Sequence, residues 1–508
     1  MQKQAHRAMR GLLSSPPWNL IWSILALTTA WHCWFASYNH DEIQHLHAAW
    51  LISAGQLPYR DFLENHHPTL WFLAAPIIAR FGSVQWLVFA ARAFDALCLL
   101  GLLAIFRRIL ARVHPGSSWK FPALLLLASF IFVRSTLEFR PDPLMNLMVY
   151  AGVLHWMAFL QEGDYRRALV SGVLFGLAAA ILQKALVVLG LVCISAAFLI
   201  VLRLWRRERI RRQAMGAAVL IAAAAVPVSL LFAAMRSLGI FKDFWFWNYP
   251  FNRFFYLQAD LPQHFSVLQN IGLNVLVDPV LWVAGATGAW LCIRDLLRRE
   301  RLSPQDECWL VLLWIAVGYL AFLSLNRFPL DQYFIVPLPL VALFAAKALS
   351  AARTPRRQAL LERSILCMPL ILIGILLLHP SNRSQRNLQQ FVLGRTSAAQ
   401  TIFVPPAFNP VFRRDAAFFW YDGELISGAY AEYCRRVGSC PGDKLALDDQ
   451  RWQSSPPAYV FLELPAYYPY RWSSRESSYH RTEIPRLWER ERLAARAPPS
   501  RLGRKGER

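Results

Sequence analysis

The sequence predicts an all-α, polytopic membrane protein with a small extramembrane α/β domain towards its C-terminus. Of its 508 residues, 56% are hydrophobic and only 17% are charged, which is more apolar than ordinary soluble domains. Apolar runs close to the roughly 20 residues that a helix needs to cross a bilayer recur from Trp18 to Leu378. Short polar loops separate these runs, and beyond Leu378 the chain becomes polar and proline-containing.

About eleven runs reach a spanning length by this criterion. Their expected bounds are Trp18–Ser37, Val84–Phe106, Phe121–Thr136, Leu144–Leu160, Ala168–Leu182, Ala185–Leu202, Ala214–Met235, Gln269–Ile293, Trp309–Leu325, Tyr333–Ser350 and Ile365–Leu378. We expect the first run to remain as a span, because no small-residue cleavage site follows it.

The apolar stretch from Ala168 to Leu202 is too long for one ordinary span, and it carries Gln183 and Lys184 near its middle. A continuous helix would bury the lysine in the membrane at a high cost in free energy. We therefore expect two short helices joined by a turn at the outer surface.

The distribution of positive charge predicts the orientation. The formal net charge is +22, and arginines gather in the loops at 107–112, 203–212, 294–301 and 353–363. Short loops rich in arginine stay on the cytoplasmic side, so we expect a cytoplasmic N-terminus and an extracytoplasmic C-terminal domain. Because the charge is divided among separate loops, we expect a lipid bilayer and no nucleic acid as partner. A bacterial inner membrane fits this composition, with the endoplasmic reticulum as the alternative.

Two outer loops are unusual. Residues 38–83 hold five of the twelve histidines together with several acids, and their apolar stretches have the pattern of short interfacial helices. The loop from Phe241 to His264 is crowded with Phe, Trp and Tyr, which favour the headgroup region of a bilayer. We interpret this second loop as an interfacial anchor, with a platform for an acceptor as the alternative.

The composition divides the chain into three parts. Residues 1–378 form the membrane region, residues 379–490 form an extracytoplasmic domain of plausible single-domain size, and residues 491–508 form a basic tail. Cys434 and Cys440 lie in the outer domain, where an oxidising compartment permits a disulfide. Spacing alone does not decide between a bridge and two free thiols.

Three acidic residues are candidates for catalysis. Asp41 and Glu42 stand where the first span meets the outer surface, and a carboxylate at the mouth of an apolar cavity can accept a proton. The alternative is that this pair simply ends a helix and is solvated. Asp142 lies in the short outer turn Arg140-Pro141-Asp142, where it can orient the arginine or contact an acceptor.

Four residues are candidates for binding a phosphate. Arg140 can do so through its forked donors, and Lys184 needs an anionic partner if it faces the protein interior. Snorkelling of Lys184 to the surface is the alternative. Arg327 and Tyr333 add a cation and a hydroxyl at the same outer level, although a membrane anchor would explain the tyrosine equally well.

Glu64 and His67, beside His66, have the ligand chemistry of a site for a divalent cation such as Zn, Mn or Mg. They do not form an i, i+4 pair on a helix, so a helix start at Asn65 explains the stretch equally well. Arg92 and Asp95, one turn apart in the second span, could form a structural ion pair.

At these positions the chain resembles the GT-C superfamily of membrane glycosyltransferases, in particular the bacterial branch related to protein O-mannosyltransferases and aminoarabinose transferases. The matching elements are Asp41-Glu42, Pro58-Tyr59-Arg60-Asp61-Phe62 with Glu64 and His67-Pro68, Arg140-Pro141-Asp142, Lys184, and the stretch from Arg327 to Pro339. Thr69, Gln183 and Ala185 depart from the residues common there, and the resemblance does not extend beyond Leu378.

The resemblance implies a polyprenyl-phosphate sugar as donor, Asp41 as the catalytic carboxylate and inversion at the anomeric carbon. We therefore expect a hexosyl- or pentosyltransferase that acts on an extracytoplasmic lipid, glycan or protein. The negative charge that develops on the leaving phosphate must be stabilised in a water-poor site, which Arg140, Lys184 and Arg327 could do. The alternatives are a transporter or lipid flippase, whose charges would line the bilayer midplane, and a scaffold that does not need the acid pair.

Overall fold

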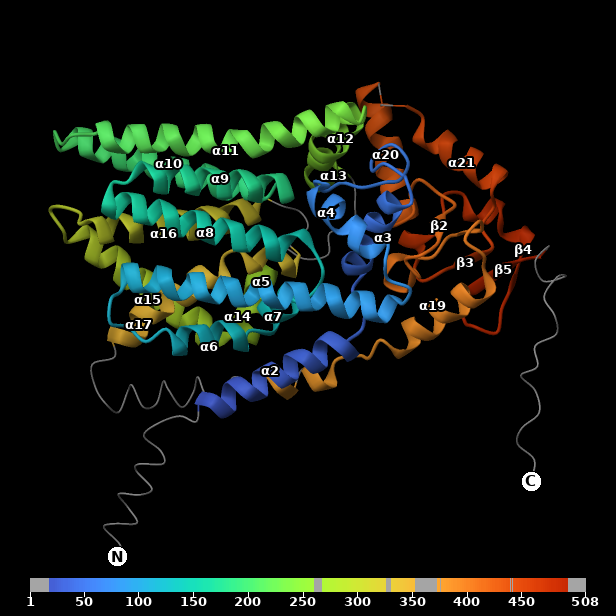
Figure 1. The fold of residues 1–508 in the computed structure, drawn as a ribbon, viewed down its shortest axis with the longest axis horizontal. Helices are drawn as coiled ribbons and strands as arrows, with labels where there is room; N and C mark the ends of the chain where they lie inside the picture. Colours follow the sequence, from blue (N-terminus) through green and yellow to red (C-terminus); the bar gives the residue numbers. More distant parts are fainter. Residues whose placement is uncertain are drawn as a thin grey trace, which may run out of the picture.

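The structure, a computed structural model, describes residues 18–259, 267–325, 330–351 and 372–491, apart from 375, 439 and 441. Within these ranges, six helices are long and apolar enough to cross a membrane, and they lie side by side at one end of the molecule (Figure 1). They are α5 (Val84–Val113), α8 (Pro141–Glu162), α10 (Ala185–Trp205), α11 (Arg211–Ser237), α15 (Pro279–Leu297) and α16 (Pro304–Ser324). The predicted all-α polytopic membrane fold is confirmed.

Shorter helices complete the bundle. They are α2 (Trp18–Phe35), α6 (Lys120–Ala128), α7 (Phe130–Thr136), α9 (Tyr165–Ile181), α14 (Val267–Val277) and α17 (Leu338–Ala351). The expected pair of helices around Lys184 is confirmed, because α9 ends at Ile181 and α10 begins at Ala185. The expected span Ile365–Leu378 falls largely outside the described residues.

Three expected spans are wrong in their continuity. The run Phe121–Thr136 breaks at Ser129, whose hydroxyl instead caps α7 by accepting the Phe132 N–H. The run Gln269–Ile293 breaks at Asp278, because Pro279 has no N–H to continue the helix. Ser129 Oγ donates a hydrogen bond to Asp278 Oδ2 at 2.5 Å, so the two breaks meet.

The third of these runs, Tyr333–Ser350, begins with a 3₁₀ turn, η2 (Asp331–Ile335), and becomes α-helical only at Leu338. Tyr333 therefore lies on a tight turn ahead of α17, and not within a membrane-spanning helix. This turn places the tyrosine beside Arg140 and Lys184, at the ends of α8 and α10.

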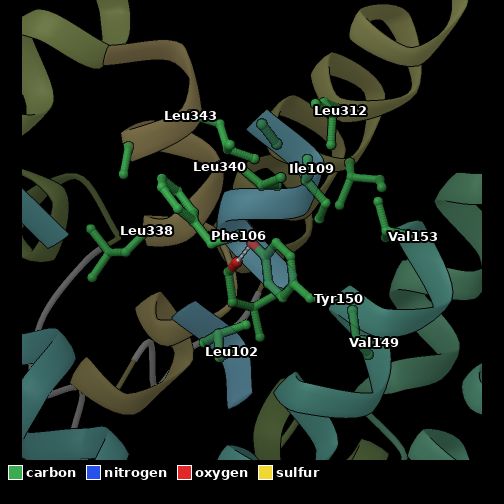
Figure 2. Packing of buried hydrophobic residues seen from close by; sticks show 14 of the residues in the cluster. Leu102, Phe106, Ile109, Val149, Tyr150, Val153, Leu312, Leu338, Leu340 and Leu343 are labelled. Atoms are coloured by element: carbon green, nitrogen blue, oxygen red, sulfur yellow. Dashed lines mark hydrogen bonds between the residues drawn. The ribbon is translucent and has the colours of Figure 1, made fainter. Parts of the chain in front are cut away.

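The bundle core is formed by apolar side chains from α5, α8, α16 and α17, shown in Figure 2. Phe106 and Leu340 are at most 1% exposed, and the Tyr150 hydroxyl donates to the Val336 carbonyl at 2.6 Å. Helices α9 and α11 approach closely at Gly172, where an added Cβ would lie 2.3 Å from a backbone oxygen of α11. Small residues permit such close packing of membrane helices.

The layer between the bundle and the C-terminal domain contains α3 (His40–Ser53), α4 (Thr69–Ile78), α12 (Phe241–Phe246), the π-helical turn η1 (Trp247–Phe251) and α13 (Asn252–Leu257) (Figure 1). Two helices thus form in the loop at 38–83, as expected, and α3 is mostly buried within the protein. The interpretation of the aromatic loop as a lipid anchor is wrong for Trp247, which is fully buried and stacks on Tyr430 at 5.4 Å between ring centroids. Residues 260–264 of this loop lie outside the described residues.

The C-terminal domain combines helices with two small sheets, as expected from its composition. Its helices are α19 (Arg383–Arg395), α20 (Gly423–Val437) and α21 (Lys444–Ser454), with 3₁₀ turns η3 (Pro406–Phe408), η4 (Pro465–Tyr467), η5 (Trp472–Ser474) and η6 (Glu476–Ser478). Strands β1 (Thr401–Ile402) and β2 (Arg414–Asp415) pair in parallel, while β3 (Tyr459–Phe461), β5 (Leu487–Arg490) and β4 (Tyr479–Arg481) form an antiparallel sheet in the order β3-β5-β4.

Direct contacts hold the C-terminal domain against the layer of α3. The His47 ring contacts the Val411 carbonyl at 2.6 Å and the Asp415 carboxylate at 2.5 Å, and the Trp420 indole donates to the Leu63 carbonyl at 3.2 Å. The structure also resolves the question of the two outer cysteines. Cys434 and Cys440 form a disulfide between Cα atoms 5.5 Å apart.

Candidate functional site

A cavity of about 480 Å³ lies where the ends of several bundle helices meet the C-terminal domain. Five of the residues that the sequence predicts for the site line this cavity, which we call the chamber: Asp41, Arg140, Asp142, Lys184 and Tyr333. They come from α3, the start of α8, the turn before α10, and η2. Side chains far apart in sequence thus share one polar space.

Asp41 and Arg140 form an ion pair at one wall of the chamber. Asn39 caps α3 and accepts the Asp41 N–H at 3.0 Å, which fixes the first turn that carries this carboxylate. Arg140 precedes Pro141, the first residue of α8, and is extended as a residue before proline prefers. The arginine side chain is only 5% exposed, whereas the Asp41 side chain is 29% exposed. Burial lowers the pKa of Arg140.

Lys184 and Asp142 form a second ion pair, with 2.9 Å between Nζ and Oδ1. Lys184 Nζ also lies 3.9 Å from the centroid of the Tyr333 ring, within the range of a cation–π interaction. Burial lowers the pKa of Lys184, and the charge of Asp142 opposes that shift. The lysine therefore faces a partner in the protein, as expected for an interior position, and does not snorkel to the surface.

Glu42 lies elsewhere, although it follows Asp41 directly. It is fully buried, and its carboxylate receives two hydrogen bonds of 2.7 Å from Arg92. Arg92 also donates to carbonyls at the end of α2, among them that of Cys33 at 3.3 Å. The expected pair of Arg92 with Asp95 is wrong: the arginine pairs with Glu42, and neither carboxylate oxygen of Asp95 has a hydrogen-bond partner among the described residues.

Glu64 and His67, which the sequence predicts as ligands of one metal site, make separate contacts in the structure. His67 donates from Nδ1 to the Ala179 carbonyl at 2.7 Å, and its Nε2 accepts from the Tyr249 hydroxyl at 3.1 Å. Glu64 Oε2 instead lies 3.7 Å from Nδ1 of His66. Within the described part of the chain, no group of three His, Cys, Asp or Glu residues is arranged to hold a metal.

Glu64 and His66 nevertheless have atoms free for a ligand. Glu64 Oε1 and His66 Nδ1 are both buried without a hydrogen-bond partner in the described ranges. Burial raises the pKa of Glu64 well above its usual value and lowers that of His66 to about 4. If a cation displaces the proton of Glu64, its carboxylate and the neutral imidazole of His66 have suitable ligand chemistry, with water or a phosphate supplying the remaining ligands.

A second cavity, of about 660 Å³, adjoins the chamber. The two cavities share lining residues, among them Lys184, Tyr256 and Tyr333. The walls of the second cavity are mainly apolar and aromatic, including Trp245 and Phe322. A polar space and an apolar space therefore meet at the lysine.

The C-terminal domain contributes chamber residues that the sequence does not single out as functional. Asp422, Tyr421 and Tyr467 line the chamber, and Asp422 Oδ1 lies 3.8 Å from Nε2 of His40. Burial raises the pKa of Asp422 to about 7 and lowers that of His40 to about 3. No motif surrounds Asp422, so only the docking of α20 could reveal its place.

Comparison with solved structures finds similar folds. ArnT from Cupriavidus metallidurans bound to undecaprenyl phosphate matches with a TM-score of 0.65 at 13% identity, over 95% of this chain and 99% of ArnT. Apo ArnT matches with the same TM-score at 15% identity, over 97% of this chain and 100% of ArnT. The apo oligosaccharyltransferase of Archaeoglobus fulgidus matches with a TM-score of 0.50 at 12% identity, over 73% of this chain and 57% of that protein. The sequence matches no protein-family model, and no curated protein resembles it significantly.

These matches, at 12–15% identity, show the fold that the chain shares with ArnT and with the oligosaccharyltransferase. The chain has the GT-C fold. The resemblance inferred from Asp41, Arg140 and Lys184 is therefore confirmed for the fold. Because the match covers nearly all of both chains, the GT-C likeness extends beyond Leu378, which the sequence did not indicate. Arg327, which the sequence also predicts for the site, lies outside the described residues.

Proposed function

We propose that the protein is an inverting glycosyltransferase that moves a sugar from a polyprenyl phosphate to an acceptor outside the cytoplasm. The observation that carries this proposal is the meeting of two cavities at Lys184: a polar chamber with paired charges and an apolar space beside it. A sugar phosphate fits the first and an isoprenoid tail fits the second. A lipid-linked sugar needs both environments at once, because its head is polar and its tail is apolar.

The roles of the chamber residues follow from their charges. Arg140 and Lys184 bind the donor phosphate and stabilise the negative charge that grows on it as the bond to the sugar breaks, with Arg327 a further candidate. Asp142 and Tyr333 hold Lys184 in place. Asp41 orients Arg140 and carries a negative charge towards the positive charge that develops on the anomeric carbon, as carboxylates do in glycosyl transfer. Glu42, tied to Arg92, keeps the turn before α3 in position.

A divalent cation is part of the proposal. Glu64 and His66 would hold it, and the cation would supply further positive charge for the donor phosphate. His67, which the sequence pairs with Glu64, has both ring nitrogens in other hydrogen bonds. It therefore shapes the wall between α9 and η1 in this proposal.

The acceptor is an envelope glycan, lipid or protein, and the sugar is a hexose or a pentose. We further propose a bacterial inner membrane, a cytoplasmic N-terminus and an extracytoplasmic C-terminal domain, on the basis of the arginine-rich loops. A transporter or flippase is less well supported, because its polar residues would line the middle of the bundle. The paired charges here lie at the ends of α8, α9 and α10, beside the C-terminal domain.

The proposal is tested by mass spectrometry of envelope glycans from cells with and without the gene. A sugar that is absent only from the deletion strain identifies the sugar that is transferred, and the glycan, lipid or protein that lacks it identifies the acceptor. A detergent extract of membranes from the deletion strain, which holds the unused donor and the unmodified acceptor, then serves as the assay mixture. Purified protein must restore the missing sugar in this extract; an extract that stays unchanged contradicts glycosyl transfer.

A further inference from the structure

A further cavity, of about 890 Å³, lies within the C-terminal domain. We call it the distal cavity. Its walls come mainly from the turns η5 and η6 and the strands β4 and β5, and both strands lie away from the bundle (Figure 1). Among the described residues, it shares no lining residue with the chamber or with the apolar cavity beside the chamber. A ligand of the distal cavity is therefore not the isoprenoid tail of a donor.

Charged side chains of both signs line the distal cavity: Glu424, Glu463, Glu476, Arg481 and Arg486. Within the described part of the chain, none of the three carboxylates accepts a hydrogen bond or forms an ion pair. Burial raises the pKa of Glu463, as expected for a carboxylate that has lost water without gaining a hydrogen bond. The carboxylates outnumber the guanidinium groups, so the distal cavity does not favour a phosphate. No three acids of the described residues are arranged to hold a metal ion.

Aromatic rings accompany these charges. Tyr468, Trp472 and Trp488 line the distal cavity, and the two tryptophan rings meet edge to face with 5.8 Å between their centroids. Tyr468 and Trp488 are half-buried, so part of each ring stays accessible. Aromatic rings offer a rigid apolar surface, and charged groups form strong hydrogen bonds. A sugar needs both, because its ring has C–H groups on its faces and hydroxyls around its edge.

One thin wall separates the distal cavity from the chamber. Leu464 and Tyr467, in and beside η4, line the chamber, whereas their neighbours Glu463 and Tyr468 line the distal cavity. The start of α20 packs directly on this segment, since a Cβ added to Gly423 would lie 2.5 Å from the Tyr468 carbonyl oxygen. A ligand in the distal cavity is thus one layer of backbone away from the chamber.

We propose that the distal cavity binds an oligosaccharide that belongs to the acceptor, an inference that rests on the proposed glycosyl transfer. The acceptor is then a glycan or a glycolipid with several sugars. Small-molecule pockets measure about 300–1,000 Å³, and the distal cavity lies in the upper part of this range, so a short oligosaccharide fits it better than a single sugar. The bound sugars hold the acceptor while its reacting end passes around η4 into the chamber.

The test measures binding of fluorescently labelled oligosaccharides that mild acid releases from envelopes of the deletion strain. Full-length wild-type protein in detergent should bind them. Glu463→Ala and Glu476→Ala should each weaken this binding by roughly 10-fold, as expected for the loss of a hydrogen bond to a charged group. Binding of undecaprenyl phosphate should not change, because its proposed site lies in the chamber.

A matched control separates the distal cavity from the general charge of the domain. Glu483→Ala removes an acid of the same domain that is 71% exposed and does not line the distal cavity. This control should bind the oligosaccharides like wild type. Thermal unfolding in detergent should be the same for Glu463→Ala, Glu476→Ala and wild type, because neither carboxylate has a hydrogen-bond partner within the described residues.

The outcomes distinguish this inference from the proposed function. If wild-type protein binds the oligosaccharides but transfers no sugar in the deletion-strain extract, the proposed function is wrong, and the acceptor role of the distal cavity is wrong with it. If wild-type protein transfers sugar but binds no released oligosaccharide, or binds it equally well after both substitutions, only the inference is wrong. An equal loss of binding in Glu483→Ala also overturns the inference. Weaker oligosaccharide binding in Glu463→Ala and Glu476→Ala alone, with unchanged lipid binding, supports it.

Discussion

Asp41 and Glu42 are neighbours in sequence, yet their carboxylates have opposite environments. Glu42 is fully buried and held by Arg92, which joins the end of α2 to the start of α3. Asp41 is 29% exposed, pairs with Arg140 and faces the chamber. Consecutive side chains on a helix point about 100° apart, so one carboxylate can lie in the protein interior while the next faces the chamber. Two neighbouring carboxylates thus have different surroundings.

A third acid–arginine pair completes the comparison. Arg60 and Asp61 belong to the same loop, 2.9 Å apart, but the arginine side chain is 52% exposed. The three pairs form a series from buried, through chamber-facing, to solvent-exposed. Substitutions along this series should have effects that decrease in the same order.

The largest effect is expected from Glu42→Ala. Removing one partner leaves Arg92 charged and buried, which costs about 3–5 kcal/mol. The unfolding free energy or the thermal midpoint in detergent should fall accordingly, with loss of folded protein in the membrane. Arg92→Met should be at least as damaging, because it also frees the carbonyls at the end of α2. A Glu42→Ala protein of normal stability would refute a structural role.

Asp41→Asn should spare stability and reduce transfer by about 10²- to 10³-fold, the range for removing one preorganised electrostatic group. Arg140 keeps a partner when the donor phosphate is bound, so binding of undecaprenyl phosphate should not weaken. Transfer in the deletion-strain extract and lipid binding to the purified protein measure the two quantities separately. Unchanged turnover by a folded variant would contradict the role of Asp41.

Lys184→Met should weaken binding of undecaprenyl phosphate by roughly 10- to 100-fold, as expected for the loss of a hydrogen bond to a charged group. The matched control is Lys347→Met, which removes a lysine that pairs with Asp295 away from both cavities. That control should bind the lipid like wild type. Equal affinity for Lys184→Met and wild type would mean that the phosphate lies elsewhere.

The smallest effect is expected from Arg60→Ala. An exposed ion pair contributes at most about 1 kcal/mol, so the unfolding free energy should change by less than that and transfer should be unchanged. The same melting and transfer assays check this expectation. A large loss of transfer would show that Arg60 contacts a substrate and would break the order of the three pairs.

The sequence indicates part of the site because of where its charges lie. Arg140, Asp142 and Lys184 interrupt apolar runs, and a charge there requires a partner or a polar surrounding. Asp422 carries no such signal, since it is one acid among several in a polar domain. The break between α14 and α15 was foreseeable from Pro279, while the sequence carries no comparable signal at Ser129, whose hydroxyl bonds Asp278 in the folded chain.

The sequence by itself determined the membrane class, the two helices around Lys184 and the gathering of polar residues at one end of the bundle. Hydropathy and charge act locally along the chain, so they can be read without coordinates. The tertiary structure alone decided that Arg92 holds Glu42, that Trp247 packs on Tyr430, and that Asp422 meets His40. Burial and pairing depend on what a distant segment places beside a residue, and the docking of the C-terminal domain onto α3 provides those segments.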